Sequence, residues 1–429
     1  MFNFQKISFD NALHFCLVGL FFATPISSSA KSIFLISSVI IIILNPVTRD
    51  ILNSLVRQKY FISIVLLVLF AGLAAFWSPA SMPEKLLVLE KWSKLLYLPI
   101  LVAGLYNLKT RSSAVNAFLV AMFLTCLLSI YMHLTGKWQV GKITADSVFR
   151  NHIMTGIMMA FATYLSGIMF LQAKNYQRLY FLVLTALFSY QILFINQSRT
   201  GYAIYFLLMS LLVVQKLKFR DAILGLMSLC LIFGASLFFS ATLASRVGLV
   251  YQEIANYNKD KNSPIGYRIQ FHQFAENLMQ RHPIIGNGTG SFTYLFKNEN
   301  PVPAWTSDPT HSGKLLEPHS QYWFVAAELG GIGILLFGIF YFELLFRFWR
   351  LGNMAPVAIS LFLVLIAGNF TDSLLFYSGS GYFFLMFFAL FLSEKVLEPR
   401  EIKSFLPIRL PQIMIISSLR GTKQPREQR

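Results

Sequence analysis

The stretch Phe194–Phe206, FINQSRTGYAIYF, joins two apolar runs through a short polar segment that contains Arg199. Ser198 is a good N-cap residue for the helix that follows, and the free N–H groups of a helix start carry partial positive charge. A guanidinium at this position is therefore favourable only beside an anion. Because a helix start and an arginine together make a phosphate site, we expect Ser198 and Arg199 to bind a phosphate group. An arginine that only extends to the membrane interface is the alternative.

The remainder of the chain is as apolar as the two runs that flank Arg199. Of its 429 residues, 55% are hydrophobic and 13% are charged, and its mean hydropathy is +0.59. Because a helix that crosses a bilayer needs about 20 mostly apolar residues, the sequence predicts an all-α polytopic membrane protein with about 12 transmembrane helices. The predicted segments are residues 11–29, 32–45, 60–77, 95–107, 114–134, 151–172, 179–196, 200–215, 221–241, 320–346, 354–371 and 377–393.

The basic residues of the short connections predict the orientation. If the N-terminus is cytoplasmic, each even-numbered connection is cytoplasmic and carries Lys or Arg, as the positive-inside rule requires. The odd-numbered connections hold fewer such residues, and Arg199 is an exception among them. Both termini are then cytoplasmic, residues 242–319 form one large periplasmic loop between helices 9 and 10, and a bacterial inner membrane is the expected location. The first apolar run is taken as an uncleaved span, with a signal peptide as the alternative.

The chain is expected to divide into a transmembrane domain, residues 1–393, and a basic cytoplasmic tail, residues 394–429. The net charge of +17 comes mainly from short connections and the tail, which favours contact with anionic membrane lipids over nucleic acid. The three cysteines stand alone in apolar runs without the spacing of a metal or redox site. We therefore expect no cofactor and no nucleic-acid partner.

Within the large loop, SPIGYRIQFHQFAENLMQRHP (Ser263–Pro283) is typical of a helix, with one proline in its first turn and another beyond its end. A polar stripe runs along it through Arg268, His272 and Glu276. On a helix at the membrane surface, such a stripe can face a lipid-linked headgroup. A solvated face is the alternative for His272 and Glu276. The apolar face of the same helix is expected to contain Tyr267, Phe271, Phe274 and Leu278.

The loop ends with two further motifs. HPIIGNGTGSF (His282–Phe292) lacks the strand that a nucleotide-binding loop requires, so its glycines predict a tight turn. In the second motif, His319 stands at the mouth of the tenth predicted span, as either a polar anchor or a catalytic base. Gly330 follows about three helical turns later, which would place it on the same helix face as His319 and nearly opposite Glu328.

These motifs resemble those of the O-antigen ligase and polymerase family, integral membrane glycosyltransferases that use undecaprenyl-diphosphate-linked glycans. The resemblance covers most of the chain up to about Leu392, and it implies a GT-C-like fold with an active site that faces the periplasm. It rests on QSRTGY (Gln197–Tyr202), on GYRIQF followed by HPIIGNGTGSF, on PHSQYWFVAAELGGIG (Pro318–Gly333) with its spaced histidine and glycine, and on SMPEKLLVLEKWSKLLYLP (Ser81–Pro99).

The resemblance also implies roles for individual residues. Arg199 in SRTG and Arg268 in GYRIQF would hold the donor pyrophosphate, and His319 in PHSQY would assist transfer. The residue after His319 is serine, where the family often has asparagine. Further candidates for substrate binding are Ser198, His272 and Arg246, the last of which matches no motif.

The chemistry expected of such a site is a direct inverting displacement without a metal. Arginines, which stay charged and bind in a bidentate manner, stabilise the leaving pyrophosphate. A histidine with a pKa near neutrality takes or orients the proton of the acceptor hydroxyl. Because the sequence has no DxD pair, we expect arginines to replace a divalent cation.

The sequence leaves several functions open. An O-antigen ligase transfers its glycan to lipid A-core oligosaccharide, and the spacing of His319 and Gly330 favours this reaction. A polymerase joins lipid-linked repeat units with the same donor. A protein O-oligosaccharyltransferase is less favoured because no added C-terminal periplasmic domain is evident. A transporter or lipid flippase would carry charges at mid-membrane and two related halves, whereas here the exceptional charges lie at the outer face.

Overall fold

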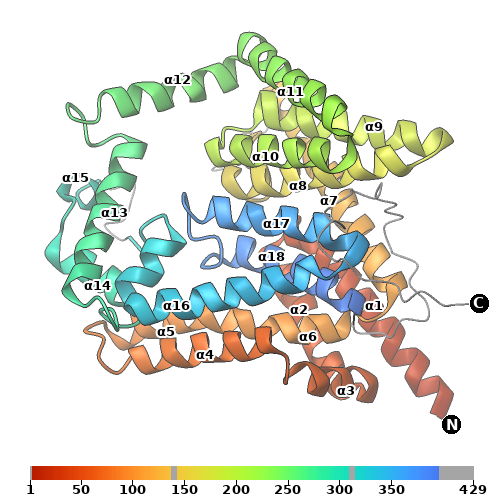
Figure 1. Cartoon of the computed structure of the whole chain (residues 1–429), viewed down its shortest axis with the longest axis horizontal. Coiled ribbons are helices and arrows are strands. Elements are labelled where there is room, and N and C mark those ends of the chain that lie inside the picture. Colours follow the sequence, from red (N-terminus) through yellow and green to blue (C-terminus); the bar gives the residue numbers. More distant parts are fainter. Residues whose placement is uncertain (1, 137–142, 309–314, 396–429) are drawn as a thin grey trace, which may run out of the picture.

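The computed structural model describes residues 2–136, 143–308 and 315–395, and in these residues every regular element is helical (Figure 1). The all-α prediction is therefore confirmed. The tail expected from residue 394 lies almost wholly outside the described residues.

The helices follow one another with short connections. Their bounds are α1 Phe2–Ile26, α2 Ser28–Leu44, α3 Pro46–Leu55, α4 Lys59–Ala74, α5 Met82–Ser93, α6 Tyr97–Gly104, α7 Leu108–Thr135, α8 His152–Gln172, α9 Asn175–Tyr190, α10 Arg199–Lys216, α11 Phe219–Phe239, α12 Ala241–Ala255, α13 Pro264–Arg281, α14 Ser291–Glu299, α15 Pro303–Thr306, α16 Gln321–Trp349, α17 Ala355–Gly368 and α18 Ser378–Leu392.

Each predicted apolar segment overlaps one of these helices, but fewer of them are long enough to span a bilayer. Among the described residues, 6 helices are long and apolar enough to cross a membrane, or up to 7 if the bent pair α2 and α3 counts as one span. That pair bends by 92° at Pro46, where the proline begins a new helix. The multi-pass character is confirmed, and the count of about 12 crossings stays a prediction.

Polar side chains at the joints decide where several helices begin. Asn151, Ser198, Ser240 and Ser320 each cap the helix that follows by accepting a hydrogen bond from a backbone N–H of its first turn. Each is followed by an apolar run, so the change from polar to apolar sequence coincides with the helix start. The cap expected at Ser198 is confirmed, with its Oγ 2.9 Å from the nitrogen of Gly201.

The helices form a bundle in which α16, α17 and α18 lie between two groups (Figure 1). On one side, α4 packs against α16 and α6 packs against α18; on the other side, α10 packs against α17 and α8. Helix α11 lies at the periphery and buries only Ala222 and Ser236. Its apolar surface is suited to contact with lipid.

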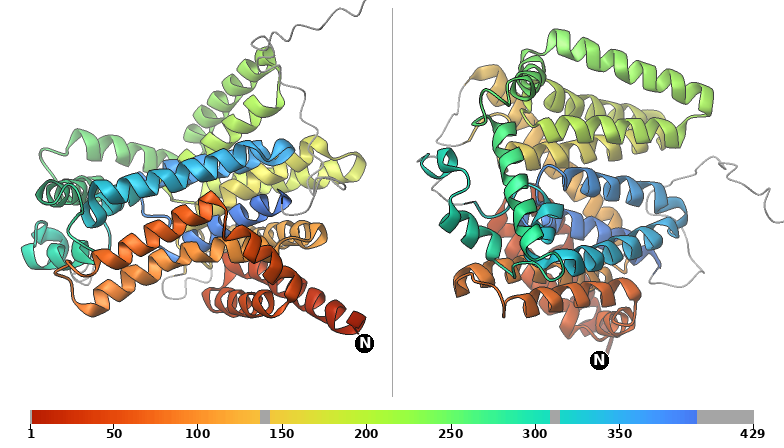
Figure 2. Two further views of the ribbon diagram at one scale, coloured as in Figure 1. Left: turned by 60° about the horizontal axis from the view of Figure 1, so that its bottom comes forward. Right: turned by 60° about the vertical axis from the view of Figure 1, so that its left-hand side comes forward.

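The four helices α12–α15 lie together at one end of the bundle, called the cap end below, while the Phe2 end of α1 lies at the other end (Figures 1 and 2). They correspond to the large loop predicted for residues 242–319. The odd-numbered connections meet at the cap end, as the predicted topology requires. The hydrogen bonds that link them are Arg150 to the carbonyl of Thr24, Asn196 to that of His152, Thr289 to that of Ala74, Gln321 to that of Asn369, and Lys31 to the Ser378 hydroxyl.

The glycine-rich turn after α13 is inserted into the hydrogen-bond ladder of α16. Gly330 has φ 63° and ψ −158°, which breaks the helix. The N–H of Gly331 donates to Pro283, and the carbonyl of Glu328 accepts from Gly288. A Cβ on Gly330 would lie 2.4 Å from the nitrogen of Gly286, so only glycine fits there. The predicted tight turn is confirmed, and its partner is the broken helix α16.

We predict that Gly330→Ala destabilises the protein because alanine cannot adopt this backbone conformation and its methyl group collides with the turn. The expected cost is about 3 kcal/mol, measured as a lower thermal midpoint in detergent. The matched control is Gly338→Ala on the same helix, where a Cβ would meet no atom within 4 Å. The control should be neutral or slightly stabilising, and equal effects of the two variants would contradict the close approach at Gly330.

Candidate active site

The segment around Arg199 is built by a local change in helix type. After α9, residues Gln191–Ile195 form a π-helical turn, a feature that is often found at functional sites. The turn ends at Asn196, whose side-chain oxygen lies 2.8 Å from the nitrogen of Ser198. Helix α10 then begins at Arg199 and crosses α8 where Gly201 faces Gly156. These contacts fix the direction of α10 and place Arg199 at the cap end.

Arg199 has an anion beside it, and that anion comes from the chain itself. Its Nη1 and Nη2 atoms lie 2.9 and 2.5 Å from the two oxygens of Glu253 on α12. The hydrogen bonds from Arg199 hold the pKa of Glu253 below its usual value. Glu253 also accepts the N–H of Ile265 at 3.0 Å, so it connects α10 to the start of α13. The sequence predicts an anion at Arg199 but does not identify Glu253.

Arg246, also on α12, binds elsewhere. Its guanidinium donates to the side-chain oxygen of Gln197. Arg246 and Glu253 are two helical turns apart, so together they fasten one face of α12 to the α9–α10 joint. The structure therefore places Arg246 beside the segment that holds Ser198 and Arg199, in a contact within the protein.

Helix α13 has the predicted apolar face and polar stripe. Phe271, Phe274 and Leu278 are buried, whereas Arg268 and His272 line a cavity of about 370 Å³, called the α10–α13 cavity below. Burial lowers the pKa of His272, whose Nε2 lies 3.4 Å from the carbonyl of His319. Within the described part of the chain, no hydrogen bond or ion pair is formed by the Arg268 side chain. Arg268 is therefore a cation in this cavity without a carboxylate partner.

The α10–α13 cavity is polar at one end and apolar along its walls. Arg199, Ala203 and Leu207 follow one face of α10 from the polar end into the bundle. Gly368 and Phe370, at the end of α17, line the opposite wall. A ligand that fits this cavity therefore has an anionic group and an apolar chain.

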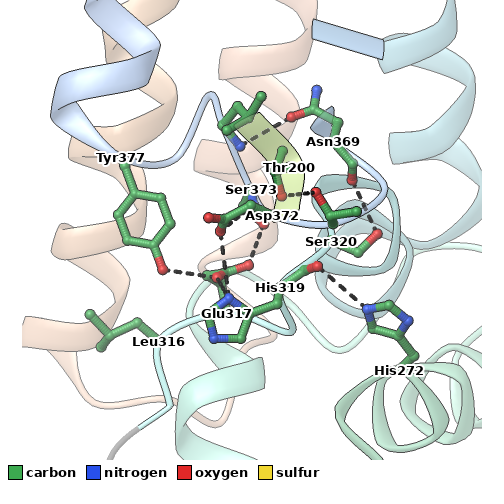
Figure 3. Close-up of polar contacts among 12 residues, drawn as sticks. Thr200, His272, Leu316, Glu317, His319, Ser320, Asn369, Asp372, Ser373 and Tyr377 are labelled. Carbon is green, nitrogen blue, oxygen red and sulfur yellow. Dashed lines mark hydrogen bonds and ion pairs between the residues drawn. The ribbon is translucent and has the colours of Figure 1, made fainter. Parts of the chain in front are cut away.

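His319 stands beside two carboxylates (Figure 3). Its Nδ1 lies 3.2 Å from Glu317 Oε1 and 3.5 Å from Asp372 Oδ1. The backbone of His319 has φ 54°, a left-handed conformation that is unusual for a residue with a side chain. Such strain costs about 1–3 kcal/mol and is concentrated at functional sites. Its cost is consistent with selection for the position of the imidazole.

Other side chains hold the two carboxylates in place. Glu317 is buried and accepts hydrogen bonds from the Ser373 hydroxyl at 2.5 Å and the Tyr377 hydroxyl at 2.8 Å. Burial raises the pKa of Glu317. Asp372 accepts the N–H of Ser373 at 3.0 Å. The cluster of Glu317, His319 and Asp372 is therefore a preorganised polar network between α16 and the α17–α18 turn.

The carboxylates determine the acid–base state of His319. Burial lowers its pKa, but contact with Asp372 and the charge of Glu317 outweigh burial, so that the pKa lies above the usual value of a histidine. Both carboxylates approach Nδ1, which favours the tautomer with the proton on that atom and leaves Nε2 as the acceptor. His319 is thus arranged as a general base.

Asn369 joins the two segments that carry this cluster. Its backbone oxygen accepts the N–H of Gln321 at 3.0 Å, and its side-chain oxygen accepts the N–H of Leu374 at 3.0 Å. Its side-chain nitrogen donates to the Tyr341 hydroxyl at 2.6 Å. Because Asn369 is fully buried, these bonds fix His319 relative to Asp372.

The structure corrects the expected relation between His319 and Gly330. Helix α16 starts at Gln321 and breaks at Gly330, so the two residues do not share a helix face. The partners of His319 are Glu317 and Asp372, and neither was identified from the sequence. One signal was present for Asp372, which is an isolated charge between two apolar runs, as Arg199 is. Glu317 lies two residues from His319 and gave no comparable signal.

Glu317, His319 and Asp372 are also the group of described residues that could hold a metal ion, since their ligand atoms lie within 4.8 Å of one another. Glu317 already accepts two hydrogen bonds from protein hydroxyls, which leaves it less free to bind a cation. The expectation of a metal-independent reaction stays a prediction, and chelation tests it.

The fold and the site together define a multi-pass membrane protein with a histidine base, two carboxylates and a cationic amphipathic cavity. Residues 181–338 match the family model described as O-antigen ligase. This segment contains Arg199, Arg268 and His319, while Asp372 lies beyond it. The match confirms the predicted family, and the chain is a member of the O-antigen ligase and polymerase family of glycosyltransferase-like enzymes, which implies lipid-linked glycan substrates. A comparison with curated proteins finds no significant match.

We predict that Asp372→Asn moves the acidic limb of the pH–rate profile to lower pH. A general base must be neutral, so activity falls as the pH falls through the pKa of His319. Asp372 raises that pKa, and its removal lets His319 stay neutral at lower pH. The measurement is kcat/KM against pH for the purified protein.

The matched control is Thr371→Val, which alters the neighbouring residue and its contact with Thr200 without changing a charge. Its acidic limb should coincide with that of the unaltered protein. An unmoved limb in Asp372→Asn would show that the titrating group is not His319.

Proposed function

We propose that the chain is an O-antigen ligase that transfers a glycan from undecaprenyl diphosphate to lipid A-core oligosaccharide. The cap end then faces the periplasm, and both termini lie on the cytoplasmic side of the inner membrane. The observation that carries the proposal is the α10–α13 cavity, which is cationic at one end, apolar along its walls and adjacent to His319.

The cavity matches the two parts of a lipid diphosphate. Its apolar wall on α10 extends over two helical turns from Arg199 to Leu207, about 12 Å. A prenyl chain lies along this wall, and its diphosphate meets Arg199 and Arg268. The N–H groups at the start of α10 add partial positive charge at the same end.

The proposed reaction is a displacement at the anomeric carbon of the donor. An acceptor hydroxyl attacks this carbon while the bond from carbon to the phosphate oxygen breaks. The hydroxyl proton moves to Nε2 of His319, and the negative charge moves to the leaving diphosphate. Asp372 and Glu317 stabilise the imidazolium that forms, and the arginines stabilise the diphosphate.

The two arginines have different parts in this scheme. Glu253 already balances the charge of Arg199, although a bidentate contact leaves further guanidinium N–H groups for a phosphate. Arg268 carries a charge without a carboxylate partner. Arg268 therefore supplies most of the attraction for the donor, and Arg199 orients the diphosphate.

We predict that Arg268→Gln raises the donor KM by about 10- to 100-fold, as expected for the loss of a charge-assisted contact. Arg199→Gln also raises the donor KM, partly because it leaves Glu253 unpaired and repulsive. The double variant Arg199→Gln/Glu253→Gln removes that repulsion and should recover part of the loss. Steady-state kinetics with purified protein give the comparison. Full recovery in the double variant would mean that Arg199 only balances Glu253 and does not touch the donor.

The decisive cellular experiment is deletion of the gene, followed by gel analysis of lipopolysaccharide. For a ligase we expect loss of every O-antigen band and accumulation of polymer on undecaprenyl diphosphate; a polymerase deletion retains core that carries a single repeat. Complementation with His319→Asn should fail, with transfer at least about 100-fold lower. Asparagine tolerates the left-handed backbone at this position, so the variant keeps its membrane abundance. Normal banding from His319→Asn would remove His319 from the mechanism, and EDTA should leave transfer by the purified protein unchanged.

A further inference from the structure

A second cavity lies on the other side of the Glu317, His319 and Asp372 cluster. It has a volume of about 310 Å³ and lies between the starts of α8 and α18, and it is called the α8–α18 cavity below. Its lining includes Arg150, Asn151, Asp372, Tyr377, Ser378 and Ser380. The volume is at the lower end of the range of small-molecule sites.

Three cations surround this cavity and are bonded to neutral groups. Arg150 donates to the carbonyl of Thr24, and Lys31 donates to the Ser378 hydroxyl at 2.6 Å. Lys94 donates to the carbonyl of Phe376. Within residues 2–136, 143–308 and 315–395, none of the three cations is within ion-pair distance of a carboxylate. Lys31 and Lys94 are almost fully buried.

Burying a cation without a counter-charge costs several kcal/mol. At Arg199 the protein avoids this cost with Glu253. At the α8–α18 cavity it places three cations together at the start of α18, where the helix N-terminus adds further positive potential. This contrast indicates that the missing negative charge is supplied from outside the chain.

Ser380 provides a second, independent indication of a ligand. Its side chain is fully buried and lines the cavity, and among the described residues its hydroxyl has no hydrogen-bond partner. Buried hydroxyls are rarely left without a partner. A ligand with acceptor oxygens would satisfy Ser380 as well as the cations.

The position of the cavity relates it to the acceptor. In Figure 3, Tyr377, which lines the α8–α18 cavity, and His272, which lines the α10–α13 cavity, lie on opposite sides of Glu317 and His319. An inverting displacement brings the attacking oxygen to the face of the sugar opposite the leaving group. If the diphosphate occupies the α10–α13 cavity, the acceptor approaches from the α8–α18 cavity.

We infer that the α8–α18 cavity binds an anionic group, phosphate or carboxylate, on the acceptor glycan. The anion lies at the end with Arg150 and Ser378, and the reacting hydroxyl lies at the end with Asp372, close to His319. This inference rests on the proposed glycosyl transfer, and it adds that the acceptor is recognised by its charge.

The test compares acceptors with and without their anionic groups, using the full-length protein in lipid nanodiscs. The acceptors are lipid A-core, the same material after enzymatic dephosphorylation, and the same material with its carboxyl groups reduced. Loss of the recognised group should raise the acceptor KM about tenfold or more and leave the donor KM unchanged. If neither treatment raises the acceptor KM, the inference is wrong.

Arg150→Gln should raise the acceptor KM by a similar factor for the intact acceptor and have little further effect once the recognised anion is gone. The matched control is Lys297→Gln, which removes a positive charge from exposed α14 at the same end of the molecule. The control should leave both KM values unchanged. An equal loss by Arg150→Gln with every acceptor would contradict recognition of an anion.

Because Arg150 also bonds to Thr24, its removal can disturb folding, and Ser380→Ala provides a second variant. The Ser380 hydroxyl has no partner to lose, so thermal stability should be unchanged or slightly higher, while the acceptor KM rises severalfold. An unchanged acceptor KM in Ser380→Ala would exclude this hydroxyl from the site and overturn the assignment of the cavity.

A direct binding measurement separates this inference from the proposed function. Glucosamine 6-phosphate should raise the thermal midpoint of the unaltered protein and of Lys297→Gln, but not that of Arg150→Gln. If transfer is absent but this stabilisation is seen, the proposed function fails while the anion site stands. If transfer occurs but neither phosphate nor carboxylate affects it, the proposed function stands and the inference falls.

Discussion

The bonds of Asn369 are the constraint on which the arrangement of the candidate active site depends. Its backbone and side chain connect the start of α16, the turn before α18 and Tyr341 in the middle of α16. His319 and Asp372 lie on the two segments that it joins, and they are 53 positions apart in the chain. A buried amide that satisfies all of these groups leaves little freedom for their relative position. The strained backbone of His319 can persist because its surroundings are fixed in this way.

The distribution of counter-charges distinguishes structural from functional cations. In a low-dielectric environment an unpaired charge is costly, so a protein either supplies a partner or keeps the charge for a ligand. Arg199 has Glu253, and the contact also locates α12 and α13. Arg268, Arg150 and Lys31 have no such carboxylate, and they line or border the two cavities that flank His319. The asymmetry explains why one arginine joins helices while another is available to substrate.

Local features were predictable from sequence, and features that depend on distant contacts were not. The cap at Ser198, the two faces of α13 and the glycine turn depend on residues within a few positions, and all were predicted correctly. Glu253 lies far from Arg199 in sequence, and Asp372 lies far from His319, so no local pattern relates them. The supposed alignment of His319 with Gly330 assumed an unbroken helix. It failed because the turn at Gly286 takes over hydrogen bonds of α16 itself.

That insertion also determines which part of the cap end can act as a hinge. The turn after α13 exchanges backbone hydrogen bonds with α16 on both sides of Gly330, so α13 and α14 are anchored to the bundle as firmly as one strand to another in a sheet. Helix α12 buries only Leu243, and polar contacts from Arg246 and Glu253 hold it to the α9–α10 joint. A bulky glycan that enters beside Arg199 therefore meets one rigid wall and one yielding wall. Arg268 and His272 stand on the rigid wall, which keeps their geometry constant while α12 moves.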